Sequence, residues 1–291
     1  MAKYEIKDGE AIIPEGTTEI PDKAFYNNDE ITSIVIPEGV TNIGFQAFCG
    51  TSLASIVIPE SVTEIGDKAF WGCEFTSIVI PEGVTEIPNG AFEECYSLAS
   101  IIIPKSVTKI GDRAFYNCTS LSSVVIPEGV TEIPKGAFEN CNSLASIIIP
   151  KSVTKIGHRA FYNCTSLSSV VIPDNVTKIG YEAFWNCEFT SINIPKSMTT
   201  IGEEAFEGCR NLISIIIPES VADIEALAFK GCYNLTSVTI LNGEIRIEDS
   251  PDDIFDECPS LEHIYVPAGT TAHFKEIFGE GLHKFITEID S

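Results

Sequence analysis

The chain has 291 residues, 44% of them hydrophobic, which is enough to bury a sizeable core. Its 18 basic and 42 acidic residues give a net charge of −24, so the average electrostatic field repels nucleic-acid backbones and anionic lipid headgroups. We therefore expect no nucleic-acid binding. We also expect no membrane insertion, because no apolar run approaches the roughly 20 residues that a membrane-spanning helix needs.

Residues 1–13 lack the apolar run of a secretory signal. Two locations follow as expectations: the cell surface or the extracellular space if a signal has been removed, and the cytoplasm otherwise. The few apolar residues of this segment lie between charged neighbours, which predicts an N-terminal cap over residues 1–13.

From residue 14 to residue 242 the chain repeats one pattern every 22 or 23 residues, which predicts a repeat solenoid. The recurring prolines are Pro14, Pro37, Pro59, Pro81, Pro104, Pro127, Pro150, Pro173, Pro195 and Pro218. An Ala-Phe pair keeps the same period, with its ring at Phe25, Phe48, Phe70, Phe92, Phe115, Phe138, Phe161, Phe184, Phe206 and Phe229. Residues 97–127 recur at 143–173 with one difference, Asp112 against His158, so the middle of the chain reads as a duplicated two-coil block.

Within one coil, apolar residues alternate along a short strand, which ends at Pro104 because proline donates no hydrogen bond to a ladder. A second short extended segment and a helical turn follow, and both direct apolar side chains inward. The predicted inward set is Leu98, Ile101, Ile103, Val107, Ile110, Ala114, Phe115 and Cys118. One coil alone cannot remove these groups from water, so we expect the coils to stack into one elongated core, with layers about 4.8 Å apart.

Charged residues alternate in sign between successive coils at two positions of the repeat. The residue after the proline is, in chain order, Glu82, Lys105, Glu128, Lys151, Asp174, Lys196 and Glu219. Four residues later the chain has Glu86, Lys109, Glu132, Lys155 and Lys178. We expect opposite charges to meet across adjacent strands, with each pair stabilising the register by about 0.2–1 kcal/mol.

The repeat degrades after residue 242. Residues 243–291 are predicted to form a final divergent repeat and a C-terminal cap, with a helix from Thr271 to about Phe278. The acidic stretch 248–257 lacks the spaced ligands and the turn glycine of a calcium loop, so a solvated cap loop is expected there.

The repeated motif is Ile-Pro-x-x-Val-Thr-x-Ile-Gly-x-x-Ala-Phe-x-x-Cys-x-x-Leu-x-Ser-Ile. Over about residues 12–267 it resembles the repeat of the BspA-like leucine-rich-repeat proteins of bacteria and some protists. The resemblance implies a right-handed parallel β-solenoid of leucine-rich-repeat type, with about eleven coils and short helical turns opposite the strands. Characterised members are surface adhesins, so the resemblance also implies a non-enzymatic protein-binding module for cell adhesion, whose partner is a host matrix, plasma or neighbouring-cell protein.

The same features fit an alternative function. The chain shows no signal sequence and has ten cysteines without evident partners, which also suits an intracellular scaffold or a self-assembling repeat rod. Weak self-association is compatible with either function.

Nine cysteines lie three residues after the repeat phenylalanine and are predicted to form a buried column of reduced, unreactive thiols. They are Cys73, Cys95, Cys118, Cys141, Cys164, Cys187, Cys209, Cys232 and Cys258. Cys49 falls outside this register and is the candidate for an exposed, reactive thiol. No Cys-x-x-Cys pair, histidine cluster or glycine-rich phosphate loop occurs, so we expect no catalytic residue, no metal and no cofactor.

The outward strand positions supply the candidate partner-binding residues, a serine column beside an aliphatic column. These candidates are Ser100, Ile102, Ser123, Val125, Ser146, Ile148, Ser169 and Val171. The alternative is structural, because β-branched residues suit a parallel sheet whether or not they bind anything. On the side of the helical turns a second set either binds a partner or merely covers the turns: Tyr26, Trp71, Tyr116, Tyr162 and Trp185.

Overall fold

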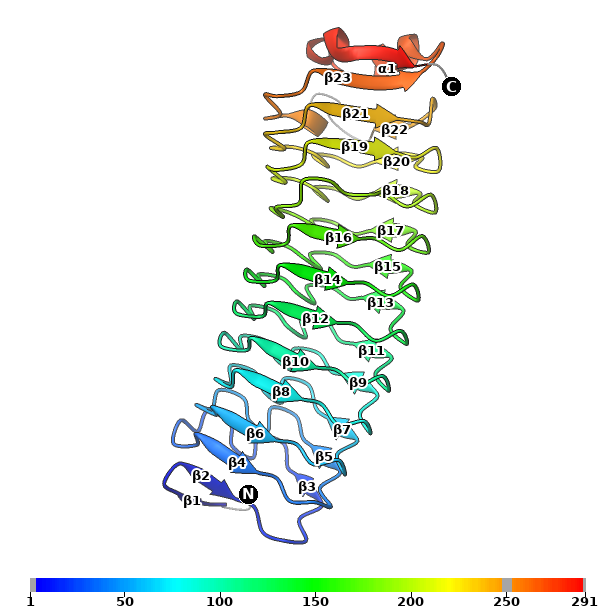
Figure 1. Cartoon of the computed structure of the whole chain (residues 1–291). Helices are drawn as coiled ribbons and strands as arrows, with labels where there is room; N and C mark the ends of the chain where they lie inside the picture. The colour runs from blue at the N-terminus through cyan, green and yellow to red at the C-terminus, as the bar shows by residue number, and fades with distance from the viewer. Residues whose placement is uncertain (1–3, 248–252, 290–291) are drawn as a thin grey trace.

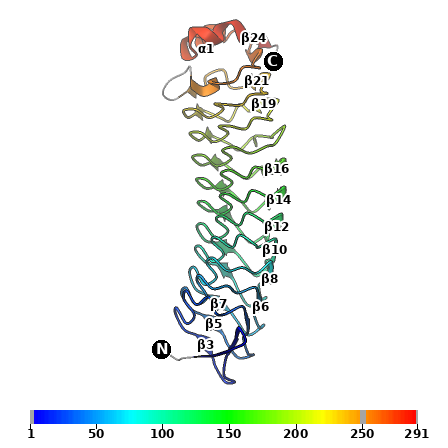
Figure 2. The same cartoon turned by 90° about the vertical axis from the view of Figure 1, so that its left-hand side faces the viewer.

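A computed structural model of the chain describes residues 4–247 and 253–289. The molecule is an elongated stack of layers with its two termini at opposite ends (Figure 1). The view turned by 90° shows the same stacking from the side (Figure 2). Each layer is one repeat of the sequence, and neighbouring layers pair in parallel along most of the stack, so the predicted parallel solenoid is confirmed.

One side of the stack, called here the strand face, is built from a short strand in almost every coil. Its strands are β2 (Glu10–Ile12), β4 (Ser33–Val35), β6 (Ser55–Val57), β8 (Ser77–Val79), β10 (Ser100–Ile102), β12 (Ser123–Val125), β14 (Ser146–Ile148), β16 (Ser169–Val171), β19 (Ser214–Ile217), β21 (Ser237–Ile240) and β23 (His263–Pro267). Equivalent residues lie opposite one another, so Ser123 is beside Ser146 and Val125 is beside Ile148. The pattern therefore lines up each outward side chain of one coil with the same position of the next.

A second ladder runs along an adjacent side of each coil. Its strands are β3 (Glu19–Ile20), β5 (Asn42–Ile43), β7 (Glu64–Ile65), β9 (Glu86–Ile87), β11 (Lys109–Ile110), β13 (Glu132–Ile133), β15 (Lys155–Ile156), β17 (Lys178–Ile179), β18 (Thr200–Ile201), β20 (Asp223–Ile224) and β22 (Arg246–Ile247). The chain passes between the two ladders through a turn that begins at the repeat proline, where the Val107 amide donates to the Pro104 carbonyl over 3.1 Å. In the same turn the Ser106 hydroxyl donates to the Val84 carbonyl of the preceding coil over 2.7 Å.

The third side, called here the turn side, consists of successive hydrogen-bonded turns and not of a continuous helix. The Ala114 amide donates to the Gly111 carbonyl over 3.3 Å, while the Phe115 amide donates to Ala137 of the next coil over 2.9 Å. Arg113 and Asn117 have φ angles of 54° and 59°, which a right-handed helix does not contain. The helical turn expected from the sequence is therefore a set of tight turns that also forms ladder bonds between coils.

The core is one continuous column of side chains, and its centre is a stack of phenylalanine rings. The rings of Phe115 and Phe138 lie 5.2 Å apart and within 6° of parallel. In two of the three coils that are one residue short, Phe75 and Phe189 replace the repeat leucine and pack edge-on against the stack. The strand-face ladder is interrupted at three places, and two of them, between β6 and β8 and after β16, adjoin these short coils.

Both ends carry additional structure. At the N-terminal end β1 (Glu5–Lys7) pairs antiparallel with β2, and the Tyr4 ring stacks on Phe25 at 4.9 Å. At the C-terminal end lie η1 (Asp253–Phe255), α1 (Thr271–Ile277), η2 (Glu280–Phe285) and β24 (Ile286–Ile289), which pairs with β23. Among the described residues, none of the helices has both the length and the hydrophobicity that crossing a bilayer requires. Within the acidic stretch 248–257, residues 248–252 lie outside the described residues.

Candidate binding surface

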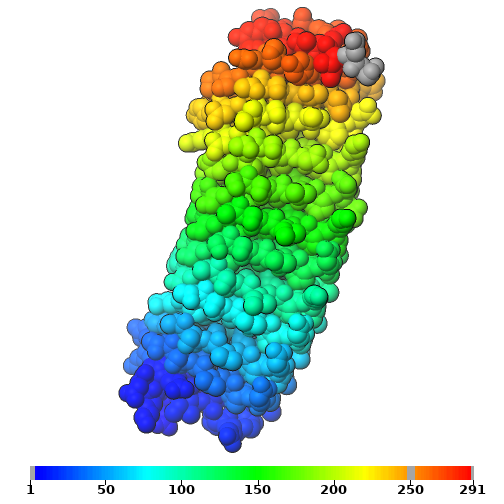
Figure 3. Space-filling model, in the orientation of Figure 1, coloured from blue at the N-terminus to red at the C-terminus, as the bar shows by residue number. Residues whose placement is uncertain are grey.

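The strand face carries two columns of outward side chains with an inward side chain between them. In β12, Val124 is 4% exposed whereas the next residue, Val125, is 67% exposed. The predicted candidates are all exposed and lie together on this face: Ser100, Ile102, Ser123, Val125, Ser146, Ile148, Ser169 and Val171. The space-filling view in the orientation of Figure 1 shows coils that form parallel ribs without a deep hollow (Figure 3).

The aliphatic column is unusually exposed for such large apolar groups. Its members are Val35, Val57, Val79, Ile102, Val125, Ile148, Val171 and Ile216, with exposed fractions between 56% and 75%. From Val35 to Val171 they succeed one another coil by coil and form a continuous stripe and not isolated surface residues. A contiguous exposed apolar stripe of this kind is typical of a surface that contacts another macromolecule.

The stripe is interrupted once, at Asn193, in a coil that forms only an isolated bridge between Ser191 and Ser214. Two adjoining shallow depressions of about 570 and 510 Å³ lie there. Among the residues that line them are Val171, Asp174, Asn193, Lys196 and Ile216. The charged residues that follow the repeat prolines therefore lie directly beside the aliphatic column.

The first set of alternating charges, called here the charged column, is exposed and unpaired. Its members are Glu82, Lys105, Glu128, Lys151, Asp174, Lys196 and Glu219. Within residues 4–247 and 253–289, no ion pair includes any of the seven. These charges are therefore free to interact with a partner.

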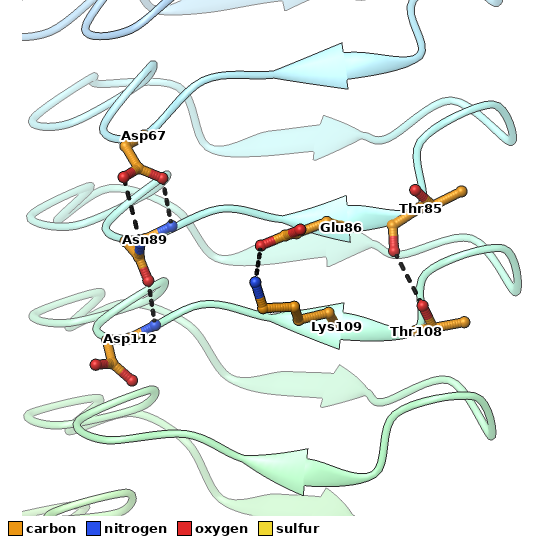
Figure 4. Close-up of polar contacts among 7 residues, drawn as sticks. All are labelled: Asp67, Thr85, Glu86, Asn89, Thr108, Lys109 and Asp112. Atoms are coloured by element: carbon orange, nitrogen blue, oxygen red, sulfur yellow. Dashed lines mark hydrogen bonds and ion pairs between the residues drawn. The ribbon is translucent and has the colours of Figure 1, made fainter.

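The second set of charges, on the other ladder, behaves differently. The Lys109 Nζ lies 2.6 Å from the Glu86 Oε1, as predicted (Figure 4). Lys155 forms an equivalent 2.6 Å pair with Glu132, which was also predicted. The prediction that opposite signs meet is wrong one coil further on, where Lys155 lies in register with Lys178. The alternation fails there because that coil has lysine where the earlier period calls for an acid.

A polar ladder beside these pairs is also satisfied within the chain. Asn89 donates two hydrogen bonds to the Asp67 carboxylate, one from its backbone amide over 3.1 Å and one from its side-chain amide over 3.2 Å (Figure 4). The Asn89 side-chain oxygen accepts from the backbone of Asp112 over 2.9 Å. These polar side chains therefore hold successive coils together.

The second candidate set, the five aromatic residues, lies on the turn side, where most of these rings are half-buried against other residues of the chain. The rings of Tyr162 and Trp185 stack on each other at 4.6 Å. The Arg159 guanidinium lies 5.2 Å from the Tyr162 ring centre and is hydrogen-bonded to Glu182, a bond that raises the pKa of Arg159. Of the five predicted rings only Tyr26 is as much as 44% exposed, and the others are half-buried.

Three buried carboxylates on the turn side were not predicted from the sequence. Glu93, Glu139 and Glu182 are 5–7% exposed. Lys68 of the preceding coil lies 3.2 Å from Glu93, and burial raises the pKa of Glu139 despite the nearby arginines. Gly136 leaves room for the charged groups, because a Cβ there would lie 3.0 Å from the Glu139 Oε2, but this role is visible only in the folded chain.

The structure places the cysteine column inside the stack. Eight of its members are 0–1% exposed, and Cys258 in the final repeat is half-buried. Each thiol donates to the carbonyl of the preceding coil's phenylalanine, as Cys118 does to Phe92 over 3.1 Å. Burial raises the pKa of the seven thiols from Cys73 to Cys209, for Cys73 to about 12, so the reactive thiolate form is disfavoured.

Cys49, the candidate for an exposed and reactive thiol, is neither. Cys49 is 3% exposed, and burial raises the pKa of its thiol. It occupies the position that the larger Tyr26 and Trp71 fill in the adjacent coils, so its short side chain lies below the surface. Thr51 takes the vacant place in the thiol column, with its hydroxyl 3.4 Å from the Cys73 sulfur.

The described residues contain no group of three or more His, Cys, Asp or Glu side chains suited to hold a metal ion. Two of the four histidines bond backbone carbonyls in the C-terminal region: His273 contacts the Ile245 carbonyl and His283 contacts that of Lys275. His158 accepts from the Tyr181 backbone amide over 3.1 Å. These three histidines therefore contact the chain's own backbone.

Three overlapping segments, 18–145, 131–262 and 177–287, match the family model described as the BspA type leucine rich repeat region. The chain belongs to the BspA-type leucine-rich-repeat family. Proteins with this BspA-type repeat are typically non-enzymatic. No curated protein matches the sequence.

Solved structures share this fold. A leucine-rich repeat protein from Bacteroides ovatus is 30% identical, with a TM-score of 0.61 over 96% of this chain and 83% of its own. A leucine-rich repeat protein from Eubacterium ventriosum is 26% identical, with a TM-score of 0.62 over 97% and 81%. The pneumococcal vaccine antigen PcpA, 20% identical with a TM-score of 0.55 over 94% and 84%, shares the fold.

Proposed function

We propose that this chain is a non-enzymatic protein-binding repeat domain of the adhesin type. It acts at the cell surface and binds a host protein or a protein of a neighbouring cell through the strand face of its central coils. The surface location rests on the resemblance to the BspA-like adhesins. The binding face rests on the chain's own residues.

The observation that carries the proposal is the exposed aliphatic column. Ile102, Val125 and Ile148 are 62%, 67% and 68% exposed on three successive strands. Burying such side chains against a partner contributes about 1.5–3 kcal/mol each when burial is complete. The exposed serines beside them supply hydroxyl groups that both donate and accept hydrogen bonds.

The charge distribution favours the central coils as the contact region. Residues 82–196 include eleven acidic and nine basic residues, so this part is nearly neutral. Residues 1–81 have 13 acids and four bases, and residues 197–291 have 18 acids and five bases. A protein partner meets less long-range repulsion over the middle of the rod than over its ends.

The test combines three substitutions, Ile102→Asp, Val125→Asp and Ile148→Asp, in the full chain. Surface plasmon resonance against a panel of purified matrix and plasma proteins measures binding, and circular dichroism measures the thermal midpoint. We expect the unmodified chain to bind at least one panel member and the triple variant to lose at least tenfold in affinity, with its fold intact.

A matched control places three aspartates on the turn side: Phe45→Asp, Tyr96→Asp and Tyr233→Asp. These residues are 41%, 51% and 41% exposed, so the added charge is the same but the face differs. The control is expected to bind like the unmodified chain. Equal binding by the strand-face triple variant would eliminate this face, and failure of the unmodified chain to bind any panel member would eliminate a host partner of these classes.

A further inference from the structure

We propose that the strand face binds a second copy of the same chain, with the two rods antiparallel and face to face. This inference rests on the proposed function, because it names an occupant for the same face. It is carried by the charged column, whose seven exposed members alternate in sign without interruption from Glu82 to Glu219.

Symmetry decides which arrangement of two copies suits this column. A half-turn about an axis parallel to the strands brings two strand faces together with the strands parallel and the rods reversed. Each column then faces the same column of the other copy: serine against serine, aliphatic against aliphatic, charge against charge. A half-turn about the rod axis instead places the charged columns on opposite sides, where they do not meet.

When two copies of the charged column run in opposite directions, every second register places opposite charges against each other. When the axis passes between the coils of Glu128 and Lys151, Glu128 of each copy faces Lys151 of the other. The next coils outward bring Lys105 against Asp174, and then Glu82 against Lys196. A shift by one coil sets like charges opposite at every position, so the column both favours one set of registers and opposes the intervening ones.

The aliphatic column selects among the permitted registers. With the axis between the coils of Glu128 and Lys151, Val125 faces Ile148 and Ile102 faces Val171, so the centre is wholly apolar. Asn193 then lies at the edge of the contact. A shift by two coils toward the C-terminus also matches the charges but sets Asn193 against Val125, which buries an amide against a methyl group. The same shift toward the N-terminus sets Glu60 against Asp174, which are two like charges.

The charge and shape of the rod confine the contact to the centre. The outer parts of both copies are strongly acidic and repel each other. The strands also turn progressively along the stack, so two such faces cross at an angle and diverge toward their ends (Figure 1).

Contact over six coils is modest in size. Six strands at about 4.8 Å, with a contact width of about 20 Å, give roughly 600 Å² per copy, below the standard value of about 800 Å². We therefore expect a dimer that dissociates on dilution and forms in the micromolar to millimolar range.

The experiment uses charge reversal and mixing. The single variants Glu128→Lys and Lys151→Glu each place two like-charged pairs at the centre of the contact. Sedimentation equilibrium of the full chain is expected to show dimers for the unmodified protein and at least tenfold weaker dimerisation for each single variant. An equimolar mixture of the two variants restores opposite charges at both central pairs and is expected to dimerise like the unmodified chain.

The matched controls are Glu132→Lys and Lys155→Glu, the same changes four residues further along, on the other ladder. These residues already pair with each other, so neither change is expected to alter dimerisation. A monomer at all concentrations, or a dimer that ignores the position-128 and position-151 charges, would overturn the inference. Since this readout needs only the chain itself, its failure is separate from the failure to bind matrix or plasma proteins.

Discussion

The strand face and the turn side of the same coils differ in how they use their functional groups. On the turn side, Arg159 is bonded to Glu182 and lies over Tyr162, which in turn stacks on Trp185. On the strand face, Val125 and Glu128 have no comparable partner within the described chain. Conspicuous residues are therefore a poor guide to a binding surface unless their contacts are known, and the plainer face is the one left free.

The largest expected effect is a loss of stability when an ion pair of the turn side is broken. Arg159→Ala leaves the carboxylate of Glu182, which is 5% exposed, without its hydrogen-bonded cation. Breaking such a pair on one side destabilises strongly, and the partial exposure of Arg159 limits the loss to about 2–3 kcal/mol. Urea unfolding measures this loss.

Lys151→Ala is the matched control, because Lys151 is an exposed cation of the charged column without an ion pair. Its expected effect is within about 0.5 kcal/mol. Equal losses for the two alanine variants would mean that the two sides do not differ in the way described.

A smaller loss of stability is expected in β12, where two neighbouring valines should respond differently to the same substitution. Val124→Thr buries a hydroxyl in the core and is expected to cost about 1–2 kcal/mol, since Val124 is 4% exposed. Val125→Thr is expected to change stability by less than about 0.5 kcal/mol, because its side chain is 67% exposed. The same unfolding measurement checks both, and a large loss for Val125→Thr would show that the aliphatic column is needed for the fold itself.

The smallest effect concerns pH. Burial, with the nearby Glu207 and Glu182, raises the pKa of Glu204 to about 7. The folded state therefore binds a proton more tightly than the unfolded state, so stability is greatest below the ordinary glutamate pKa and falls as pH rises toward and through 7.

The expected fall in the thermal midpoint is only about 1–2 °C, because the carboxyl is partly exposed. Thermal melts across this pH range measure it, and Glu204→Gln should flatten the dependence. If the thermal midpoint of Glu204→Gln varied with pH as it does in the unmodified chain, other titrating groups would account for the pH dependence.

The repeat made the stack, the inward phenylalanines and the outward serines predictable, because a strict period repeats one environment in every coil. The short coils were harder to predict. In two of the three, loss of one residue is accompanied by Phe75 and Phe189 in the core and by a break in the strand ladder, and each of these rings packs against the phenylalanines of two adjacent coils.

The errors have similar causes. Cys49 was the candidate for exposure because it leaves the thiol register, but exposure depends on the size of Tyr26 and Trp71 above and below it. The buried carboxylates were not predicted because a glutamate such as Glu139 is expected to be at the surface when only the sequence is known. Only the stacked coils show Gly136 making room for Arg113 beside it.

The thiol column has a practical consequence. Nearly every coil contains one sulfhydryl group, hidden while its layer is closed, so alkylating reagents reach a given cysteine only when that layer opens. Cys258 is only partly buried, and the cysteines deeper in the rod are expected to become labelled only as fraying advances from the ends. Mass mapping of labelled cysteines against time would thus report the local opening of this protein layer by layer, without any engineered probe.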